Sequence, residues 1–291
     1  MREQQIHTTL GQVHLYEAGE GSTTVMLLHG AGLDSAMLSW AEVMPLLAQH
    51  CHVIAVDLPG YGKSDRAVGF AGPEFYGKHL SALHQVVQQL KLEQFVLAGL
   101  SMGGALAIGY ALAYPDEITA LVPVDSWGLV GKMPMHRFYH WYVNTGLMKT
   151  SYRWMAQSNF LVRWSITSSL LGDKSKVSET LVQQLKELCG AEGAESAMQD
   201  FQRSSLTKTS AVPDYRAKLS QLQMPVLFVQ GDKDPLVPTA AVKQAATSCN
   251  AALHLMVGCK HWAPKERPEE FVSVLWKWIS SLSAAKSKAI D

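Results

Sequence analysis

Ser101 stands at the centre of a G-x-S-x-G pattern, residues 99–103, which can present a serine as a nucleophile. An apolar run, residues 95–98, precedes the pattern, and a run rich in alanine, residues 105–113, follows it. The order of strand, tight turn and helix predicts a nucleophile elbow, a strained turn that exposes the serine hydroxyl at the end of a sheet. Because a serine hydroxyl is a weak nucleophile at neutral pH, it needs a neighbouring base that is itself oriented by an acid.

Three aspartates are candidates for that acid. Asp232 and Asp234 follow the apolar run 226–229, and the catalytic groups of parallel sheets collect beyond the carboxyl ends of the strands. The motif position favours Asp234, because it lies at the tip of a turn, three residues past Gly231. Asp232, nearer the strand, and Asp125, at the end of the preceding apolar run, stay open as alternatives. Such aspartates can instead shape a turn or cap a helix.

His261 is the histidine whose place in the chain suits a catalytic base. It follows the last apolar run, residues 252–256, and precedes a helix that we expect to start near residue 268. A histidine on such a loop can lie over the end of the sheet and meet Ser101. Other histidines have simpler interpretations, since His254 lies inside a strand and His29 is expected to brace its own loop.

An oxyanion hole requires two backbone N–H groups that point at the oxygen on which negative charge develops. Met102 directly follows the nucleophile and would begin a helix, whose N-terminus favours negative charge. The second N–H is expected from the loop after the run 25–28, residues 29–32, where Ala31 is the natural donor. Met102 and Ala31 are therefore the predicted oxyanion hole.

The elements that must position these residues follow an alternating pattern. Short, continuously apolar runs are typical of parallel strands that are covered on both faces, and helical patterns lie between them. The chain therefore predicts an α/β fold with a mostly parallel central sheet flanked by helices, and residues 4–8 and 12–16 predict an antiparallel hairpin at its edge. The runs are 25–28, 53–56, 95–98, 121–124, 226–229 and 252–256, and the helices are 40–49, 74–90, 102–113, 238–248 and 268–282.

The alternation stops after residue 125 and resumes at residue 225, and the segment from about 127 to 218 is helical in pattern and rich in aromatic side chains and methionine. We interpret residues 127–218 as a helical cap inserted into a core domain formed by residues 1–126 and 219–291. The underside of a cap must face the catalytic residues. Leu100, beside the nucleophile, Trp127, at the start of the insertion, and Trp262, beside His261, are the predicted substrate contacts.

Composition limits the class of protein. The chain has 291 residues, of which 47% are hydrophobic and 17% charged, and Lys plus Arg equals Asp plus Glu at 25 each. These values suit a folded enzyme and give no basic stripe for nucleic acid. The four cysteines form no C-x-x-C pair, and no apolar stretch has the length of a signal peptide core or a membrane span. We expect a cytoplasmic protein without a metal or cofactor, and the apolar faces of the cap leave a homo-oligomer open.

Across nearly its full length the chain resembles the α/β-hydrolase superfamily. The matching motifs are His29-Gly30-Ala31-Gly32, Asp57-Leu58-Pro59-Gly60-Tyr61-Gly62-Lys63-Ser64, the elbow at Ser101, Gly231-x-x-Asp234 and Gly258-Cys259-Lys260-His261-Trp262. The resemblance implies a triad of Ser101, His261 and Asp234, an oxyanion hole at Ala31 and Met102, and a helical cap.

Among subfamilies, the chain is similar to carboxylesterases and, in part, to meta-cleavage carbon–carbon hydrolases. The latter share the serine triad and often have a tryptophan after the catalytic histidine, as at Trp262, but typically carry asparagine where this chain has Leu100. Their cap arginine has no clear counterpart here. We therefore expect a serine hydrolase that cleaves a small to medium apolar carboxylic ester through an acyl-enzyme intermediate. The alternatives are carbon–carbon hydrolysis of a vinylogous diketone and a ligand-binding protein on a hydrolase fold.

Overall fold

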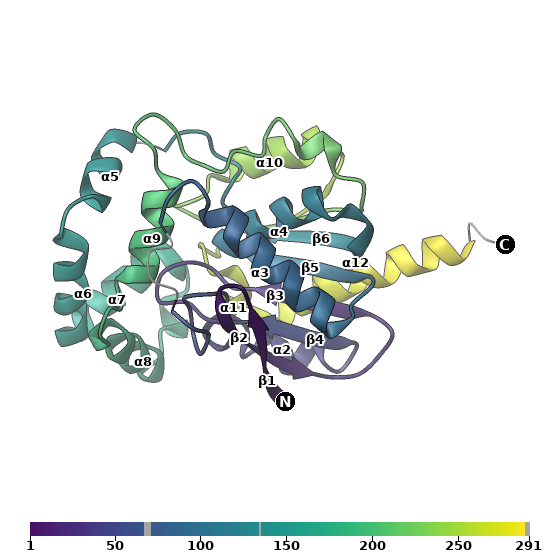
Figure 1. Cartoon of the computed structure of the whole chain (residues 1–291), viewed down its shortest axis with the longest axis horizontal. Coiled ribbons are helices and arrows are strands. Elements are labelled where there is room, and N and C mark those ends of the chain that lie inside the picture. Colours follow the sequence, from purple (N-terminus) through teal and green to yellow (C-terminus); the bar gives the residue numbers. More distant parts are fainter. Residues whose placement is uncertain (67–70, 134, 289–291) are drawn as a thin grey trace.

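The computed structural model describes residues 1–66, 71–133 and 135–288. Within these ranges the chain forms one eight-stranded sheet in the order β1-β2-β4-β3-β5-β6-β7-β8 (Figure 1). All pairs from β4 to β8 are parallel, whereas β2 is antiparallel to both β1 and β4. The strands are β1 Arg2–Thr8, β2 Gly11–Ala18, β3 Thr24–Leu28, β4 His52–Val56, β5 Phe95–Leu100, β6 Ile118–Val124, β7 Leu227–Gly231 and β8 Ala252–Met256.

Helices cover both faces of the sheet. Buried side chains of α3, α4 and α10 belong to one apolar cluster, and those of α1, α2 and α12 belong to a second. The strand β3 shows why both clusters are needed: Met26 and Leu28 point into the first, and Val25 and Leu27 into the second. Its continuous apolar run therefore fits a strand covered on both sides, and the predicted α/β fold is confirmed. These helices are α1 Ala36–Trp40, α2 Val43–Leu47, α3 Phe75–Leu90, α4 Met102–Ala113, α10 Thr239–Ser248, α11 Ala263–Glu266 and α12 Pro268–Lys288.

The predicted edge hairpin is present as β1 and β2, whereas the predicted helix 40–49 is wrong in detail. The structure has two short helices there, α1 and α2, with a break after Trp40. Pro45 explains the break, because its ring would clash with the carbonyl of Ala41 in a continuous helix. A new helix that begins at Val43 places Pro45 in its first turn, where no N–H is needed.

In the described residues, five α-helices lie between β6 and β7 and gather at one end of the molecule, at the left of Figure 1. We call them the cap helices: α5 His136–Val143, α6 Leu147–Gln157, α7 Asn159–Ser165, α8 Glu179–Gly190 and α9 Ser196–Ser205. They lie within the predicted insertion 127–218, and the division into that cap and a core of 1–126 and 219–291 stays a prediction. In the described part of the chain, no helix is long and apolar enough to cross a bilayer.

Candidate active site

Ser101 occupies a strained turn between β5 and α4. Its φ is 53°, in the left-handed region that a residue with a Cβ adopts only at a cost. The turn is closed by the approach of α4 to the loop after β3, where a Cβ on Gly103 would lie 2.5 Å from the carbonyl oxygen of His29. Close packing of glycine therefore fixes a turn that holds the Ser101 hydroxyl beyond the end of β5.

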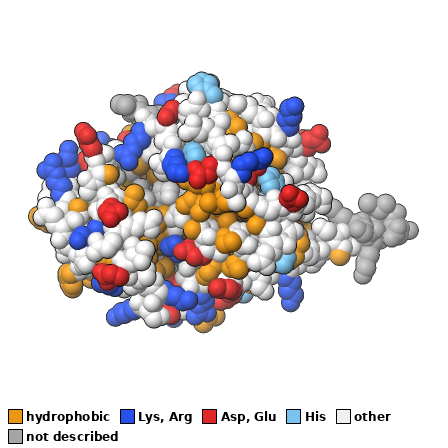
Figure 2. All heavy atoms as spheres, turned by 90° about the horizontal axis from the view of Figure 1, so that it is seen from below, with side chains coloured by type: hydrophobic (Ala, Val, Ile, Leu, Met, Phe, Trp, Pro, Cys, Tyr) orange, Lys and Arg blue, Asp and Glu red, His pale blue; other side chains and the backbone are white. Residues whose placement is uncertain are grey.

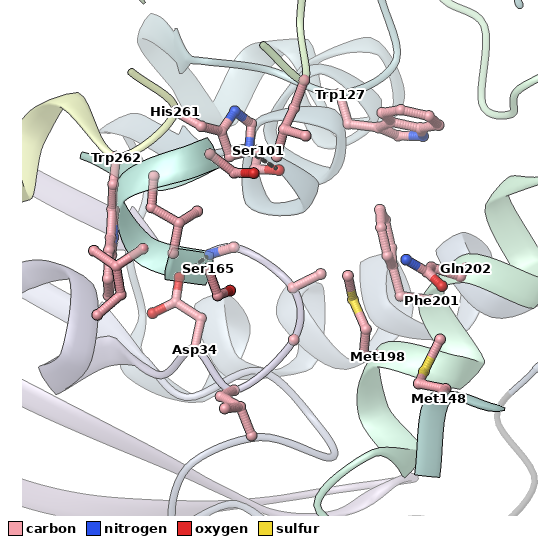
Figure 3. A pocket seen from close by; sticks show the side chains of 18 of the residues that line it. Asp34, Ser101, Trp127, Met148, Ser165, Met198, Phe201, Gln202, His261 and Trp262 are labelled. Atoms are coloured by element: carbon pink, nitrogen blue, oxygen red, sulfur yellow. Dashed lines mark hydrogen bonds between the residues drawn. The ribbon is translucent and has the colours of Figure 1, made fainter. Parts of the chain in front are cut away.

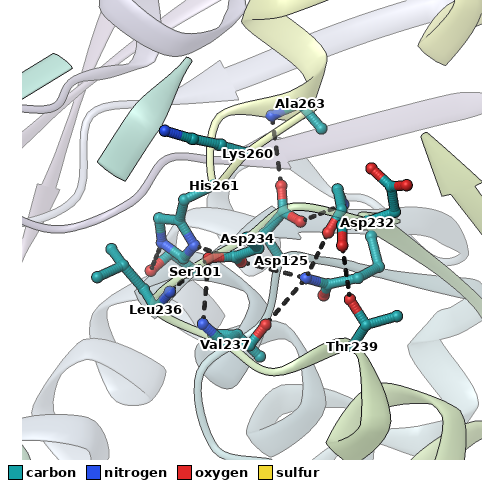
Figure 4. A network of polar contacts seen from close by, with 12 residues as sticks. Ser101, Asp125, Asp232, Asp234, Leu236, Val237, Thr239, Lys260, His261 and Ala263 are labelled. Atoms are coloured by element: carbon teal, nitrogen blue, oxygen red, sulfur yellow. Dashed lines mark hydrogen bonds and ion pairs between the residues drawn. The ribbon is translucent and has the colours of Figure 1, made fainter. Parts of the chain in front are cut away.

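The Ser101 hydroxyl and two side chains from distant loops form a continuous hydrogen-bonded chain (Figure 4). The Nε2 atom of His261 lies 2.8 Å from Ser101 Oγ, and its Nδ1 atom lies 2.8 Å from Asp234 Oδ2. Because a carboxylate only accepts, Nδ1–H donates to Asp234, which leaves Nε2 to accept the serine proton. A nucleophile, a base and an acid thus stand in the order that serine hydrolysis requires.

The loop after β7 holds Asp234 in place. Its Oδ1 atom accepts hydrogen bonds from the N–H groups of Leu236 at 2.7 Å and Val237 at 3.1 Å. The Gln230 side chain donates to Oδ2 at 3.1 Å, so that oxygen serves both Gln230 and His261. These donors satisfy a buried carboxylate and fix the direction from which it meets the imidazole.

The other two candidate aspartates brace the surrounding loops. Asp125 accepts from the N–H of Gly231 at 2.7 Å and from that of Ala263 at 3.3 Å (Figure 4). Asp232 accepts from the N–H of Gly258 at 2.6 Å. Of the three aspartates, Asp234 is the one that hydrogen-bonds to the histidine in the described structure. Asp125 ties β6 to the loops that carry Asp234 and His261.

Burial and nearby charge shift two pKa values in this cluster. Burial is the largest single influence and lowers the pKa of His261, but the charge and hydrogen bond of Asp234, together with the charges of Asp125 and Asp34, raise it by more, so the net pKa lies above the ordinary 6.5. Burial, with the charge of Asp234 added, raises the pKa of Asp125 to about 7. The site therefore stabilises the charged form of His261, whereas it disfavours the charged form of Asp125 beside the negative Asp234.

The loop after β3 lies beside the serine. Ala31 borders the cavity next to Ser101, and Met102 is the first residue of α4, so its N–H is at that helix's N-terminus. His29 braces the loop as predicted, because its Nε2 atom accepts from the Leu58 N–H at 3.0 Å. The assignment of Ala31 and Met102 to an oxyanion hole stays a prediction.

Asp34 is a residue that the sequence interpretation missed. Its buried carboxylate accepts from the N–H of Gly30 at 2.7 Å and from the hydroxyl of Ser39, which in turn accepts from the indole N–H of Trp262 at 2.7 Å. This network joins the loop before Ala31 to the residue after His261. The only local signal was an aspartate just before a helix, which usually indicates a cap and gives no sign of the link to the distant Trp262.

The catalytic side chains open onto a cavity of about 440 Å³ between the sheet and the cap helices. Leu100, Trp127 and Trp262, the predicted substrate contacts, all line it. Figure 3 shows Met148 from α6 and two residues of α9, Met198 and Phe201, across the cavity from Trp262. Their role in binding stays a prediction, but the structure places them where a substrate at Ser101 would extend.

The cavity wall is apolar, with few charges. Its ionisable acidic and basic side chains are Asp34 and His261, and the described lining contains no lysine or arginine. Polar groups come from neutral side chains such as Gln202 and Ser165 (Figure 3). Among the residues that the structure describes, no group of three or more His, Cys, Asp or Glu side chains could hold a metal ion.

The fold and this serine site define a hydrolase, and comparison with known proteins gives the family. The family model of the alpha/beta hydrolase fold matches residues 23–268, and the chain belongs to this family. A curated relative from Pseudomonas putida is 30% identical over 265 residues, which are 89% of this chain and 88% of the relative. That relative is named 2-hydroxy-6-oxononadienedioate/2-hydroxy-6-oxononatrienedioate hydrolase 2.

Solved structures show the same fold. A meta-cleavage product hydrolase from Pseudomonas fluorescens IP01 has a TM-score of 0.78 at 22% identity, covering 96% of this chain and 97% of its own. The 2-hydroxy-6-oxo-6-phenylhexa-2,4-dienoate hydrolase from Rhodococcus sp. strain RHA1 has a TM-score of 0.77 at 22% identity, covering 95% and 98%.

These relatives show that the predicted carboxylic ester substrate is wrong. The compounds in the relatives' names carry hydroxyl, ketone and carboxylate groups and contain no ester, so hydrolysis must break a carbon–carbon bond. The ester prediction relied on the lack of a clear cap arginine and on Leu100, which lies in the cavity wall and takes no part in the hydrogen-bonded chain from Ser101 to Asp234. Attack on a ketone or on an ester uses the same groups, so the motifs alone could not separate the two reactions.

Proposed function

We propose that this protein hydrolyses a carbon–carbon bond of a vinylogous diketone of the meta-cleavage type. The observation that carries the proposal is the similarity over 89% of the chain to a hydrolase of such a compound. The hydrogen-bonded chain of Ser101, His261 and Asp234 supplies the chemistry. We place the reaction in the cytoplasm, with no resident metal or cofactor.

In the keto form of such a substrate, the Ser101 oxygen attacks the ketone at C6 while His261 takes the serine proton. Asp234 holds the imidazole and stabilises its cation. The N–H groups of Ala31 and Met102 receive the negative oxygen. The bond between C5 and C6 then breaks, and its electron pair is delocalised through the conjugated chain onto the oxygen at C2.

The leaving dienolate takes the proton from His261, and an acyl group remains on Ser101. Water then attacks this acyl group, with His261 again as the base, and a carboxylic acid is released. One water molecule is consumed for each bond broken. The hydroxydienoate and the acid are the two products.

The group on C6 that this cavity suits is uncharged. Leu100, Trp127 and Phe201 supply apolar surface, and the described lining has no lysine or arginine to pair with a carboxylate, so a carboxylate on the C6 group would add a second unpaired charge to that at C1. Burying an unpaired carboxylate costs roughly several kcal/mol, because the carboxylate loses its hydration. We therefore expect an alkyl or aryl group on C6 to be preferred over a carboxylated chain.

A panel of three substrates tests the proposal. It contains 2-hydroxy-6-oxo-6-phenylhexa-2,4-dienoate, the nonadienedioate and a p-nitrophenyl ester, with loss of the dienol absorbance as the readout for the first two. We expect the highest kcat/KM for the phenyl compound and a lower value for the dioate. Turnover of the ester without turnover of either dienoate would overturn the proposal. A fluorophosphonate adduct on Ser101 in the same preparation would show that the nucleophile is intact.

A further inference from the structure

The outward sides of three cap helices carry large aromatic side chains in contact with solvent. Their exposed fractions range from 49% for Phe138 to 74% for Phe160. Phe160 and Trp164 are four residues apart on α7, and Phe138 and Trp141 on α5 have ring centroids 5.8 Å apart, so each pair shares a helix face. We call this set the cap outer face; it consists of Phe138, Trp141, Trp154, Phe160 and Trp164.

The opposite sides of the same helices are also apolar. Tyr142 of α5, Met155 of α6 and Val162 of α7 line the cavity above Ser101. A surface helix normally has one apolar face toward the core and a polar face toward water, and a helix that is apolar on both sides is normally buried on both. The cavity side accounts for one apolar face of α5, α6 and α7, and the cap outer face remains to be covered.

The segment that carries the cap outer face has charges of one sign, and the acidic side chains that pair with it come from later cap segments. Residues 126–172 contain five lysines and arginines and no aspartate or glutamate, although the whole chain has 25 residues of each sign. Lys149 and Arg163 pair with acidic residues of later cap segments, Glu195 and Glu179. The other cations next to the aromatic residues are exposed at Arg137 and Arg153, which form no ion pair within the described ranges.

We propose that the cap outer face docks onto a bilayer that contains anionic phospholipid. Tryptophan and phenylalanine beside arginine and lysine suit the interface, where the rings enter the headgroup layer and the cations meet lipid phosphates. A second copy of this chain fits less well, because the same cationic face on both partners would repel. In this proposal the protein binds to the surface of the bilayer and does not span it.

Docking of the cap outer face onto a bilayer would place the bilayer next to the cavity above Ser101. α5, α6 and α7 lie at the end of the molecule opposite the end of α12 (Figure 1), and the face in Figure 2 has hydrophobic, basic and acidic side chains at that end. Tyr139 of α5 is 41% exposed and also lines the cavity. The docked surface therefore meets the cavity at α5, and an apolar compound dissolved in the bilayer could enter beside Tyr139.

Vesicle flotation of the full chain tests the proposal. The probes are phosphatidylcholine vesicles with and without phosphatidylserine. We expect binding to the anionic vesicles at about 0.1 M salt and strong weakening at about 1 M salt. Phe160→Ser should lower the partition coefficient about tenfold, the value for one buried aromatic side chain. Arg153→Gln should lower it about fivefold.

Val257→Ser is the matched control, because Val257 is 65% exposed but lies after β8, outside the cap helices. It should bind vesicles like the wild type, and circular dichroism should show the same melting for all variants. Absence of vesicle binding, or equal binding by wild type and Phe160→Ser, would overturn the proposal. A dimer in sedimentation velocity that Phe160→Ser abolishes, without vesicle binding, would assign the face to a second copy. None of these measurements uses catalytic activity, so their failure leaves the proposed function untouched.

Discussion

At His261, burial and a neighbouring carboxylate act on the imidazole in opposite directions. Burial disfavours the imidazolium and lowers the pKa, and the charge and hydrogen bond of Asp234, together with the charges of Asp125 and Asp34, favour the imidazolium and raise the pKa by more. The base must be neutral to accept the Ser101 proton and positively charged after it has done so. A pKa above 6.5 makes neutral His261 a stronger base. It also increases the fraction of His261 that is protonated, and therefore inactive, at a given acidic pH.

This balance predicts the pH dependence of the wild type and of Asp234→Asn. Only neutral His261 is active, so kcat/KM should fall as the pH drops through the raised pKa, and the acidic limb should lie above pH 6.5. In Asp234→Asn the burial remains while the main raising influence is lost, so the limb should move to lower pH and kcat should fall about 10⁴-fold. A pH–rate profile of both proteins checks this. An unmoved limb would show that Asp234 does not control His261.

Ser101→Ala tests the nucleophile by itself. We expect kcat to fall by about 10⁴-fold or more, because the covalent path is lost while the cavity and the oxyanion hole remain. The melting temperature should stay close to that of the wild type, since a single hydroxyl is removed. Turnover near the wild-type rate with the phenyl dienoate would contradict the mechanism, and mass spectrometry should find no fluorophosphonate adduct on the variant.

The sequence was informative about catalytic side chains and poor about the residues that hold them. Ser101, Asp234 and His261 follow from motif order, and the structure brings them within hydrogen-bond distance. Asp34 accepts from a backbone N–H of its own loop and reaches Trp262 through Ser39, and Glu266 accepts from a backbone N–H of a distant segment. A carboxylate that accepts hydrogen bonds from backbone N–H groups does not require any particular side chain at the donor residue. The sequence therefore contains no motif that predicts such a pair.

At the scale of elements, the elbow depends on how closely α4 approaches the loop after β3. Gly103→Ala should lower the free energy of unfolding by about 3 kcal/mol, because its Cβ would lie 2.5 Å from a backbone oxygen that cannot move freely. Gly77→Ala is the matched control on α3, where nothing lies within 4 Å of the new Cβ. That change should raise the free energy of unfolding by about 0.5–1 kcal/mol. Urea unfolding measures both, and equal effects would contradict the close packing.

Elements were predictable where one periodicity dominated. The helix 102–113 and the strand 252–256 have the predicted bounds, because each is a continuous run between clear turn residues. The segment 136–205 was predicted only as helical, and its five helices could not be separated. Apolar residues on both sides of α5, α6 and α7 hide the amphipathic period on which such boundaries depend.

For the molecule as a whole, the important connection joins the cap to the histidine loop. The π-helical turn Ile166–Leu170 follows α7, and its Leu170 carbonyl accepts from the Trp262 N–H at 3.0 Å. The Lys260 ammonium donates to the carbonyl of Thr167 at 2.5 Å. The segment that follows the cap helix α7 therefore contacts the loop of His261 directly, and movement of this segment would reach the base as well as the cavity.

Glu266 secures this connection and gives its sharpest test. Its buried carboxylate accepts from the N–H groups of Gly172 at 2.8 Å, Asp173 at 2.6 Å and Lys260 at 3.3 Å. Glu266→Ala leaves these N–H groups without their acceptor, which should lower the free energy of unfolding by about 3 kcal/mol or more. Glu266→Gln keeps one acceptor oxygen and should lose less.

Because these bonds join the cap to the histidine loop, Glu266→Ala should also lower kcat and speed hydrogen exchange at Gly172 and Asp173. Glu269→Ala is the control, since Glu269 is exposed in the first turn of α12 and its loss should cost under about 1 kcal/mol. Urea unfolding, steady-state kinetics and hydrogen exchange of the three variants check this. If Glu266→Ala matched the control in exchange and in kcat, the cap and the base would move independently, and the π-helical turn would be a local feature of the cap alone.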